Sequence, residues 1–145
     1  MSKKYLVTGA AGFIASQVSK QLLDQGDRVV GVDNLNDYYD VRLKEWRLDQ
    51  LKAYPHAENF LFASLDIEDQ ANLVDLFQTE GPFDAVLNLA ARAGVRYSME
   101  NPHVYLSTNA EGTLNLLECM RAQGCKKLVL ASTSSLYAGQ KMPFT

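Results

Sequence analysis

The residues with the clearest chemical meaning form a glycine-containing loop near the start of the chain. Gly9 and Gly12 stand in Thr8-Gly9-Ala10-Ala11-Gly12-Phe13-Ile14-Ala15, between a short apolar run and a segment of helical period. Glycines at such a turn let the backbone approach a pyrophosphate, whose charge is received by the free N–H groups of the helix N-terminus. The spacing is Gly-x-x-Gly-x-x-Ala, so Ala15 stands where the common dinucleotide fingerprint has its third glycine. By itself the loop is also compatible with a turn of purely geometric meaning.

A carboxylate at the end of the next apolar run strengthens the ligand-binding interpretation. Asp33 closes Val29-Val30-Gly31-Val32-Asp33, about 20 residues after the glycine loop, where an acid hydrogen-bonds the adenosine ribose hydroxyls and repels a 2′-phosphate. The order of strand, loop, helix, strand and acid therefore predicts a dinucleotide site, with NAD favoured over NADP.

The elements that must position these residues alternate along the chain. Short β-branched runs predict strands at residues 5–8, 28–32, 60–63, 85–89 and 127–131, and apolar residues at helical spacing predict helices at 13–25, 40–53, 68–79 and 102–123. This alternation is typical of βαβ units in a parallel sheet with right-handed crossovers. We expect an α/β fold, a Rossmann-type doubly wound sheet of five strands in the order 3-2-1-4-5.

Length and composition exclude several classes of protein. The chain has 145 residues, and we expect residues 1–145 to form one NAD-binding domain. A net charge of −3 gives no basic footprint for nucleic acid or an anionic membrane. No run approaches the roughly 18 apolar residues of a membrane span, and the first residues lack a signal peptide, so a cytoplasmic location is expected. Cys119 and Cys125 lack metal-ligand spacing, which predicts reduced thiols and no metal.

Three segments resemble the extended short-chain dehydrogenases, specifically the NAD-dependent nucleotide-sugar epimerase/dehydratase family. The most specific is Asp33-Asn34-Leu35-Asn36-Asp37-Tyr38-Tyr39-Asp40-Val41-x-Leu43-Lys44-x-x-Arg47-Leu48, supported by Ala91-Arg92-Ala93-Gly94-Val95-Arg96-Tyr97-Ser98 and by Met142-Pro143-Phe144. Within the family they are most similar to UDP-glucuronate 4-epimerases. The resemblance implies NAD as cofactor and a UDP-sugar as substrate, whose C4 is oxidised, rotated as a 4-keto intermediate and reduced again.

The resemblance also implies roles for individual residues. The expected cofactor-binding residues are Gly9, Gly12, Phe13, Ile14, Asp33, Asn34, Asp66, Ile67, Leu89, Ala90, Ala91, Asn109 and Ser132. The expected substrate-binding residues are Ala93, Gly94, Val95, Arg96, Thr133, Ser134 and Ser135, with Thr133 also catalytic through a hydrogen bond to the reacting sugar hydroxyl. Asn109 is expected to brace the active site.

Simpler interpretations stand beside these roles. Asp66 could be a helix N-cap, Asn109 an exposed polar residue, Arg92 and Arg96 surface charges, and Tyr38 and Tyr39 core aromatics. The sequence also departs from the family pattern. Arg92 stands where a neutral glutamine is expected, Asn88 where a histidine is usual, and Ala138 precedes the glycine that the family has directly after Tyr137.

The acid–base pair of the family is not evident in this chain. A lysine four residues after a tyrosine on a helix lowers the tyrosine pKa, and Tyr137 and Lys141 have this spacing. They come too soon after Thr133, however, and Gly139 and Pro143 argue against a helix. We expect the true pair beyond Thr145, in a truncated N-terminal part that is inactive alone and self-associates, through the apolar edge of its fifth strand or through the long fourth helix, as a homo-oligomer.

Three alternatives stay open at this point. A 4,6-dehydratase would need acidic residues after Thr133, where Ser134 and Ser135 stand. A non-catalytic NAD-binding module would bind the dinucleotide without turnover, and a decayed remnant would bind no ligand.

Overall fold

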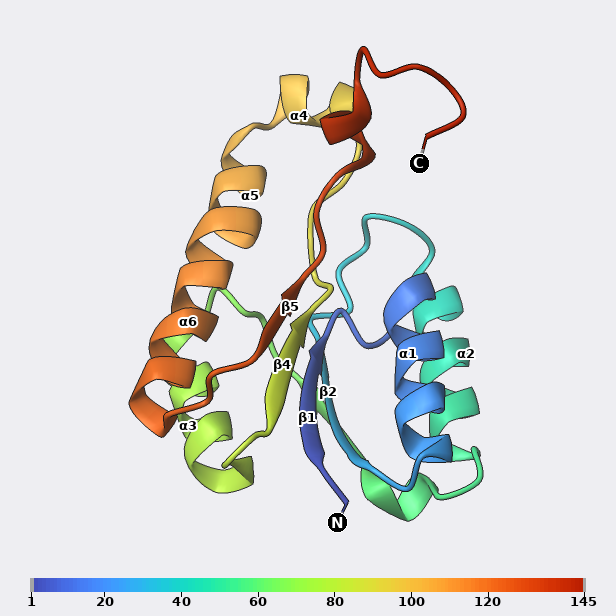
Figure 1. Ribbon diagram of the computed structural model, residues 1–145, viewed down its shortest axis with the longest axis vertical. Coiled ribbons are helices and arrows are strands. Elements are labelled where there is room, and N and C mark those ends of the chain that lie inside the picture. Colours follow the sequence, from blue (N-terminus) through green and yellow to red (C-terminus); the bar gives the residue numbers. More distant parts are fainter. Residues whose placement is uncertain (1, 145) are drawn as a thin grey trace.

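Five parallel strands form the centre of the molecule, which the computed structural model describes over residues 2–144 (Figure 1). They are β1 (Lys4–Thr8), β2 (Arg28–Asp33), β3 (Phe60–Ser64), β4 (Ala85–Asn88) and β5 (Leu128–Leu130). Their order is β3-β2-β1-β4-β5, which confirms the predicted topology. Thr8 pairs with Val32 on one side and with Asn88 on the other, so the carboxyl ends of the central strands meet at one edge of the sheet.

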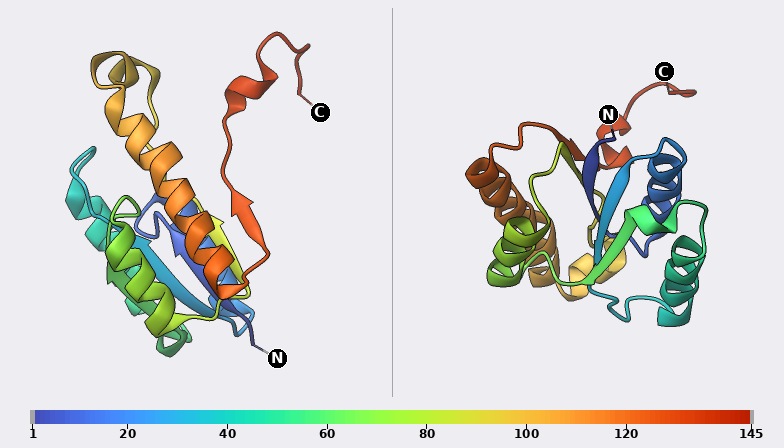
Figure 2. Two further views of the ribbon diagram at one scale, coloured as in Figure 1. Left: turned by 90° about the vertical axis from the view of Figure 1, so that its left-hand side faces the viewer. Right: turned by 90° about the horizontal axis from the view of Figure 1, so that it is seen from below.

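Helices cover both faces of this sheet (Figures 1 and 2). Their bounds are α1 (Phe13–Asp24), α2 (Val41–Lys52), α3 (Gln70–Glu80), α4 (Val95–Glu100), α5 (His103–Tyr105) and α6 (Gly112–Gln123), with short turns η1 (Ala57–Asn59) and η3 (Ser134–Tyr137). The α1–α2 face buries residues such as Val7, Leu23 and Leu51, and the α3–α6 face buries Leu6, Phe77 and Leu116. Apolar packing on both faces therefore stabilises the sheet, and with it the edge at which the strands end.

The long helix predicted at residues 102–123 is interrupted by a wider turn. Between α5 and α6 the chain forms a π-helical segment, η2 (Leu106–Glu111). Such segments are rare and often occur at functional sites. Neither η2 nor the six-residue α4 was predicted, because segments this short show no clear apolar period.

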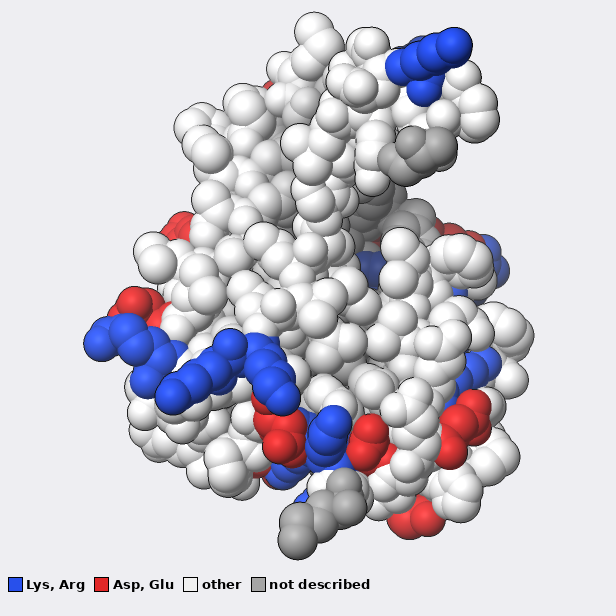
Figure 3. Space-filling model, viewed as in Figure 1, with Lys and Arg blue, Asp and Glu red and all other residues white. Residues whose placement is uncertain are grey.

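Charged side chains are unevenly distributed on the face shown in Figure 3. Lysines, arginines and acids gather toward the lower end, while the upper end, formed by α4, η3 and the chain after it, shows few charged side chains apart from one protruding basic group. Within residues 2–144 no helix combines the length and apolarity that a membrane crossing requires. Val129 and Leu130 on β5 are about half exposed. Self-association at this edge stays a prediction.

Candidate functional site

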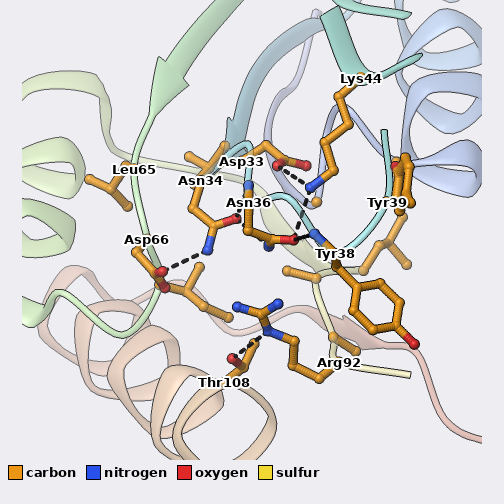
Figure 4. A pocket seen from close by; sticks show the side chains of 17 residues that line it. Asp33, Asn34, Asn36, Tyr38, Tyr39, Lys44, Leu65, Asp66, Arg92 and Thr108 are labelled. Atoms are coloured by element: carbon orange, nitrogen blue, oxygen red, sulfur yellow. Dashed lines mark hydrogen bonds and ion pairs between the residues drawn. The ribbon is translucent and has the colours of Figure 1, made fainter. Parts of the chain in front are cut away.

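A pocket opens at the carboxyl edge of the sheet, where ligands bind in doubly wound folds (Figure 4). It brings together nine of the predicted cofactor-binding residues: Gly9, Gly12, Asp33, Asn34, Asp66, Ile67, Leu89, Ala90 and Ala91. Eight residues for which no role was predicted complete its wall: Val32, Asn36, Tyr38, Tyr39, Lys44, Leu65, Arg92 and Thr108.

The glycine loop has the close backbone approach that the sequence predicts. Gly9 has a φ of +68°, and a Cβ there would lie 3.0 Å from the carbonyl oxygen of Leu89. A Cβ on Gly12 would lie 2.8 Å from the carbonyl oxygen of Gly9, which accepts a 2.7 Å hydrogen bond from the Gly12 N–H. The loop therefore cannot carry side chains at either position, and it enters α1 in a form suited to an anion.

Asp33 is the acid at the base of the pocket. Its carboxylate accepts hydrogen bonds from the N–H groups of Ala11, at 3.2 Å, and Leu35, at 2.9 Å. The Nζ of Lys44 lies 3.7 Å from its Oδ1 and donates to Oδ1 of Asn36 at 3.2 Å. Burial lowers the pKa of Lys44, and the charge of Asp33 opposes that shift. Asp33 is thus held in a fixed position in the pocket wall.

Asn34 and Asp66 join two loops across the pocket wall. The Nδ2 of Asn34 donates to Oδ2 of Asp66 at 2.6 Å, and the Glu68 N–H donates to Oδ1 of Asp66 at 3.0 Å. Asp66 does not cap the following helix, because Asp69 is the N-cap of α3. The N-cap interpretation of Asp66 is therefore wrong.

Asn109 braces the loop that follows β4. Its Oδ1 accepts from the Arg92 N–H at 2.8 Å, and its Nδ2 donates to the Arg92 carbonyl at 3.1 Å. Asn109 does not line the pocket and acts on it through Arg92. Asn109 is exposed, as the simpler interpretation expects, and its amide is nevertheless engaged by the backbone of Arg92. Asn109 and the pocket residue Thr108 are consecutive residues of the π-helical turn η2.

Asn88 replaces the usual histidine without leaving a polar group unpaired. It is 1% exposed, accepts a 2.6 Å hydrogen bond from the Thr8 hydroxyl and donates to Oγ1 of Thr113 at 3.0 Å. The Thr8 oxygen in turn accepts from the N–H groups of Leu89 and Ala90, both at 3.1 Å. This network ties β1, β4 and α6 together directly below the pocket.

Tyr38 and Tyr39 stand at the pocket mouth and not in the core, since they are 45% and 37% exposed. The Tyr38 hydroxyl donates to the Ala93 carbonyl at 2.7 Å, and the Tyr105 hydroxyl lies 2.7 Å from the Gly94 carbonyl. Burial raises the pKa of Tyr105, helped by the neighbouring tyrosines. These contacts link the loop after β2 to the loop after β4 across the pocket.

The remaining predicted residues lie outside the pocket. Phe13 and Ile14 are 73% and 64% exposed on the first turn of α1. Residues 93–96 lead into α4, and residues 132–135 follow β5, where Oγ1 of Thr133 accepts from the Ser135 N–H at 3.2 Å. The roles predicted for these residues stay predictions.

Tyr137 and Lys141 do not form a helical pair. Tyr137 ends η3, the chain then extends at Ala138, and Gly139 takes a φ of +81°. The Tyr137 ring stacks on Phe144, with centroids 5.1 Å apart. Tyr137 and Lys141 therefore lack the shared helix face that the tyrosine–lysine pair of the family needs, and the position of that pair stays a prediction.

Lys44 and Arg92 are the functional candidates that sequence reasoning missed. Lys44 occurs among charged residues of α2, where an exposed position is the ordinary expectation, yet it is 4% exposed while Trp46 is 58% exposed. For Arg92 the sequence suggests only a surface charge or a departure from the family pattern. Only the departure itself could have marked Arg92 as a residue of the pocket.

Comparisons with known proteins match this chain to nucleotide-sugar dehydratases and epimerases. Residues 6–145 match the protein family described as GDP-mannose 4,6 dehydratase. The chain is 59% identical over 140 residues to UDP-glucuronate 4-epimerase of Thermodesulfobacterium geofontis, covering 97% of this chain and 42% of that protein. It is 46% identical over 142 residues to UDP-glucuronate 4-epimerase 3 of Arabidopsis thaliana, covering 97% of this chain and 32% of the relative.

Solved structures agree with this result. A mutant of UDP-glucuronic acid 4-epimerase from Bacillus cereus, in complex with NAD and a fluorinated UDP-glucuronic acid, superposes with a TM-score of 0.84 at 33% identity, covering 98% of this chain and 44% of that one. UDP-glucose-4-epimerase from Stenotrophomonas maltophila, with bound NAD, gives 0.83 at 31% identity, covering 98% and 40%. The chain spans about two fifths of the length of these structures.

Proposed function

Since this chain belongs to the family described as GDP-mannose 4,6 dehydratase, within the extended short-chain dehydrogenases, we propose that it forms the NAD-binding part of a UDP-sugar 4-epimerase that acts on UDP-glucuronate. Relatives named UDP-glucuronate 4-epimerase in bacteria and plants support this choice of substrate. The chain corresponds to about two fifths of the bacterial relative, so the activity proposed is that of the protein in its complete natural length.

One observation supports the proposal: a single pocket brings together the glycine loop, the acid that ends β2 and the residues that follow β3 and β4. Gly9 and Gly12 form a tight loop whose backbone packing leaves no room for side chains, and backbone N–H groups at the start of α1 can receive the charge of a pyrophosphate. Asp33 stands at the end of β2, ready to accept hydrogen bonds from the ribose hydroxyls. Asp66 and Ile67 border the adjoining wall, where the adenine would lie.

The chemistry of the proposed reaction is divided between cofactor and protein. A bound NAD would supply a reversible hydride acceptor for the sugar C4. In this chain Thr133 is the residue proposed to hold the reacting C4 hydroxyl, and residues 93–96 and Ser134–Ser135 are proposed to contact the UDP-sugar. Tyr137 is not proposed as the base that takes the hydroxyl proton, because its fold position lacks a helical lysine neighbour.

The decisive experiment is an assay of the complete natural protein with NAD and UDP-glucuronate. The expected product is UDP-galacturonate, identified by chromatography and by NMR of the sugar ring. Deuterium from labelled C4 should stay with the product, since the proposed reaction returns the same hydride. Binding of NAD with no conversion of any UDP-sugar would favour a non-catalytic NAD-binding module and overturn the proposed activity.

A second candidate reaction is the 4,6-dehydration for which the matched family, GDP-mannose 4,6 dehydratase, is named. That reaction would convert a nucleotide sugar to its 4-keto-6-deoxy form. Ser134 and Ser135 follow Thr133, and neither carries the carboxyl group that the dehydratase interpretation requires. The same assay with GDP-mannose separates the candidates, because a 4-keto-6-deoxy product would favour the dehydratase.

A further inference from the structure

Arg92 presents a guanidinium group to the pocket that the protein itself leaves largely unused. Within residues 2–144 its side chain has one hydrogen-bond contact, from Nε to Oγ1 of Thr108 at 3.4 Å, and it joins none of the ion pairs found there. Figure 4 shows the side chain extending into the pocket, between Thr108 and Tyr38 and facing Asp66. Its two terminal amino groups are therefore free to contact a ligand.

The base of this side chain is rigidly placed. Both backbone polar groups of Arg92 are held by the side-chain amide of Asn109, at 2.8 and 3.1 Å. The hydroxyl of Thr108 donates to Oε1 of Glu68, so its oxygen is left to accept from Nε of Arg92. The guanidinium is thus directed into the pocket by two consecutive residues of η2, Thr108 and Asn109.

The other polar groups facing Arg92 already have partners. Asp33 is paired with Lys44 and Asp66 accepts from Asn34. Besides the dominant effect of burial and the opposing effect of Asp33, the charge of Arg92 contributes to the lowered pKa of Lys44, so both cations face the same space. An unpaired guanidinium in this space is suited to a ligand group that accepts its hydrogen bonds or stacks on its plane.

We propose that Arg92 packs its guanidinium plane against the adenine ring of the bound dinucleotide, an inference that rests on the proposed NAD site. Arg92 lies on the side of the pocket formed by Thr108 and Asp66, where the adenine is expected, while the diphosphate is served by the glycine loop. A planar, weakly hydrated guanidinium stacks well on aromatic faces. Arg92 thereby adds cofactor affinity that the glutamine expected at this position would lack.

The test compares Arg92→Gln and Arg92→Lys with the unchanged protein in its complete natural length. NAD affinity is measured by calorimetry, and Arg28→Gln serves as the control, because Arg28 is an exposed arginine at the opposite end of the sheet. We expect both Arg92 variants to weaken NAD binding by about 2- to 30-fold. Lysine should not restore affinity, because it keeps the charge and loses the plane.

Several outcomes would overturn the inference while leaving the proposed function intact. NAD affinity unchanged in Arg92→Gln, or wild-type affinity in Arg92→Lys, would assign to Arg92 no role or only a charge contact with phosphate. If the wild-type protein binds no NAD, the proposed function itself is overturned, and the inference about Arg92 is overturned with it. A second measurement uses the unchanged protein and so does not depend on the folding of a variant. The Nε–Hε NMR signal of Arg92 should shift when adenosine is added and should not shift when inorganic pyrophosphate is added. The reverse result would contradict stacking.

Discussion

The Nζ of Lys44 lies 3.7 Å from Oδ1 of Asp33, and both side chains are almost completely buried beneath the pocket. A cation on α2 is thereby matched to the acid that ends β2. Asp33 also accepts from two backbone N–H groups, so it keeps its orientation when the pocket fills. The ion pair of Lys44 and Asp33 therefore contributes to the stability of the fold and also positions a residue of the ligand site.

Replacement of Lys44 by Met should destabilise the fold by about 3 kcal/mol, because it leaves Asp33 buried with only backbone partners. The free energy of unfolding, measured by urea titration at neutral pH, checks this. Lys126→Met is the matched control, since Lys126 is exposed and should change stability by less than about 0.5 kcal/mol. Equal effects of the two substitutions would contradict a structural role for the pair.

The pH dependence of this pair has a definite sign. Burial lowers the Lys44 pKa below its usual 10.5, so the unfolded chain binds this proton more strongly in the alkaline range just below that value. The Lys44 contribution to the free energy of unfolding therefore rises with pH in that range. The difference between wild type and Lys44→Met, from urea titrations at several alkaline pH values, should grow toward pH 10.5; a falling difference would show the opposite shift.

Gly9 and Gly26 share a positive φ, and they differ in the space around them. A Cβ on Gly9 would lie 3.0 to 3.1 Å from backbone atoms of Leu89 and Ala90, whereas nothing lies within 4 Å of one on Gly26. Gly26→Ala should cost about 1 kcal/mol from backbone strain alone, and Gly9→Ala about 1–3 kcal/mol more. Thermal unfolding measures this difference, and a NAD titration should show lost binding for Gly9→Ala only.

Asn88→Ala removes the centre of a buried hydrogen-bond network. It leaves polar groups of Thr8 and Thr113 without their partner, which should cost about 1–3 kcal/mol per unpaired group. Chemical denaturation tests this against Asn59→Ala, since the Asn59 side chain forms none of the hydrogen bonds found within residues 2–144 and does not line this pocket. A loss of stability no larger than that of the control would show that the network contributes little.

Asn109 and Arg92 should act on cofactor binding as one unit. Asn109→Ala releases both backbone contacts to Arg92, so NAD affinity should fall even though Asn109 lies outside the pocket. In a double-mutant cycle with Arg92→Gln the two losses should be less than additive, because the second change removes a side chain that is already misplaced. Fully additive losses of NAD affinity, measured by calorimetry, would show that Asn109 and Arg92 act on cofactor binding independently.

Much of the fold could be predicted from the residues alone. The sheet order follows from the alternation of strands and helices, because a parallel sheet with right-handed crossovers allows few arrangements. The strand ends then place Gly9, Asp33 and Leu89 at one edge, and the structure confirms that they share a pocket. Local signals failed for the π-helical turn, which no periodicity marks. Phe13 and Ile14 are exposed on the first turn of α1, and their predicted role in cofactor binding stays a prediction.

What the sequence by itself indicated was the family, the parallel sheet, the glycine loop and the acid Asp33, while the family resemblance implied the other six of the nine pocket residues. The glycine loop and the position of Asp33 are local properties, since glycine permits a backbone that other residues do not, and a strand end occupies one edge of the sheet. The tertiary structure alone decided the parts of Lys44, Arg92 and Asn88. Each depends on distant partners, and a charge or an amide has no functional meaning until the fold places a particular group, or a free space, within hydrogen-bonding distance of it.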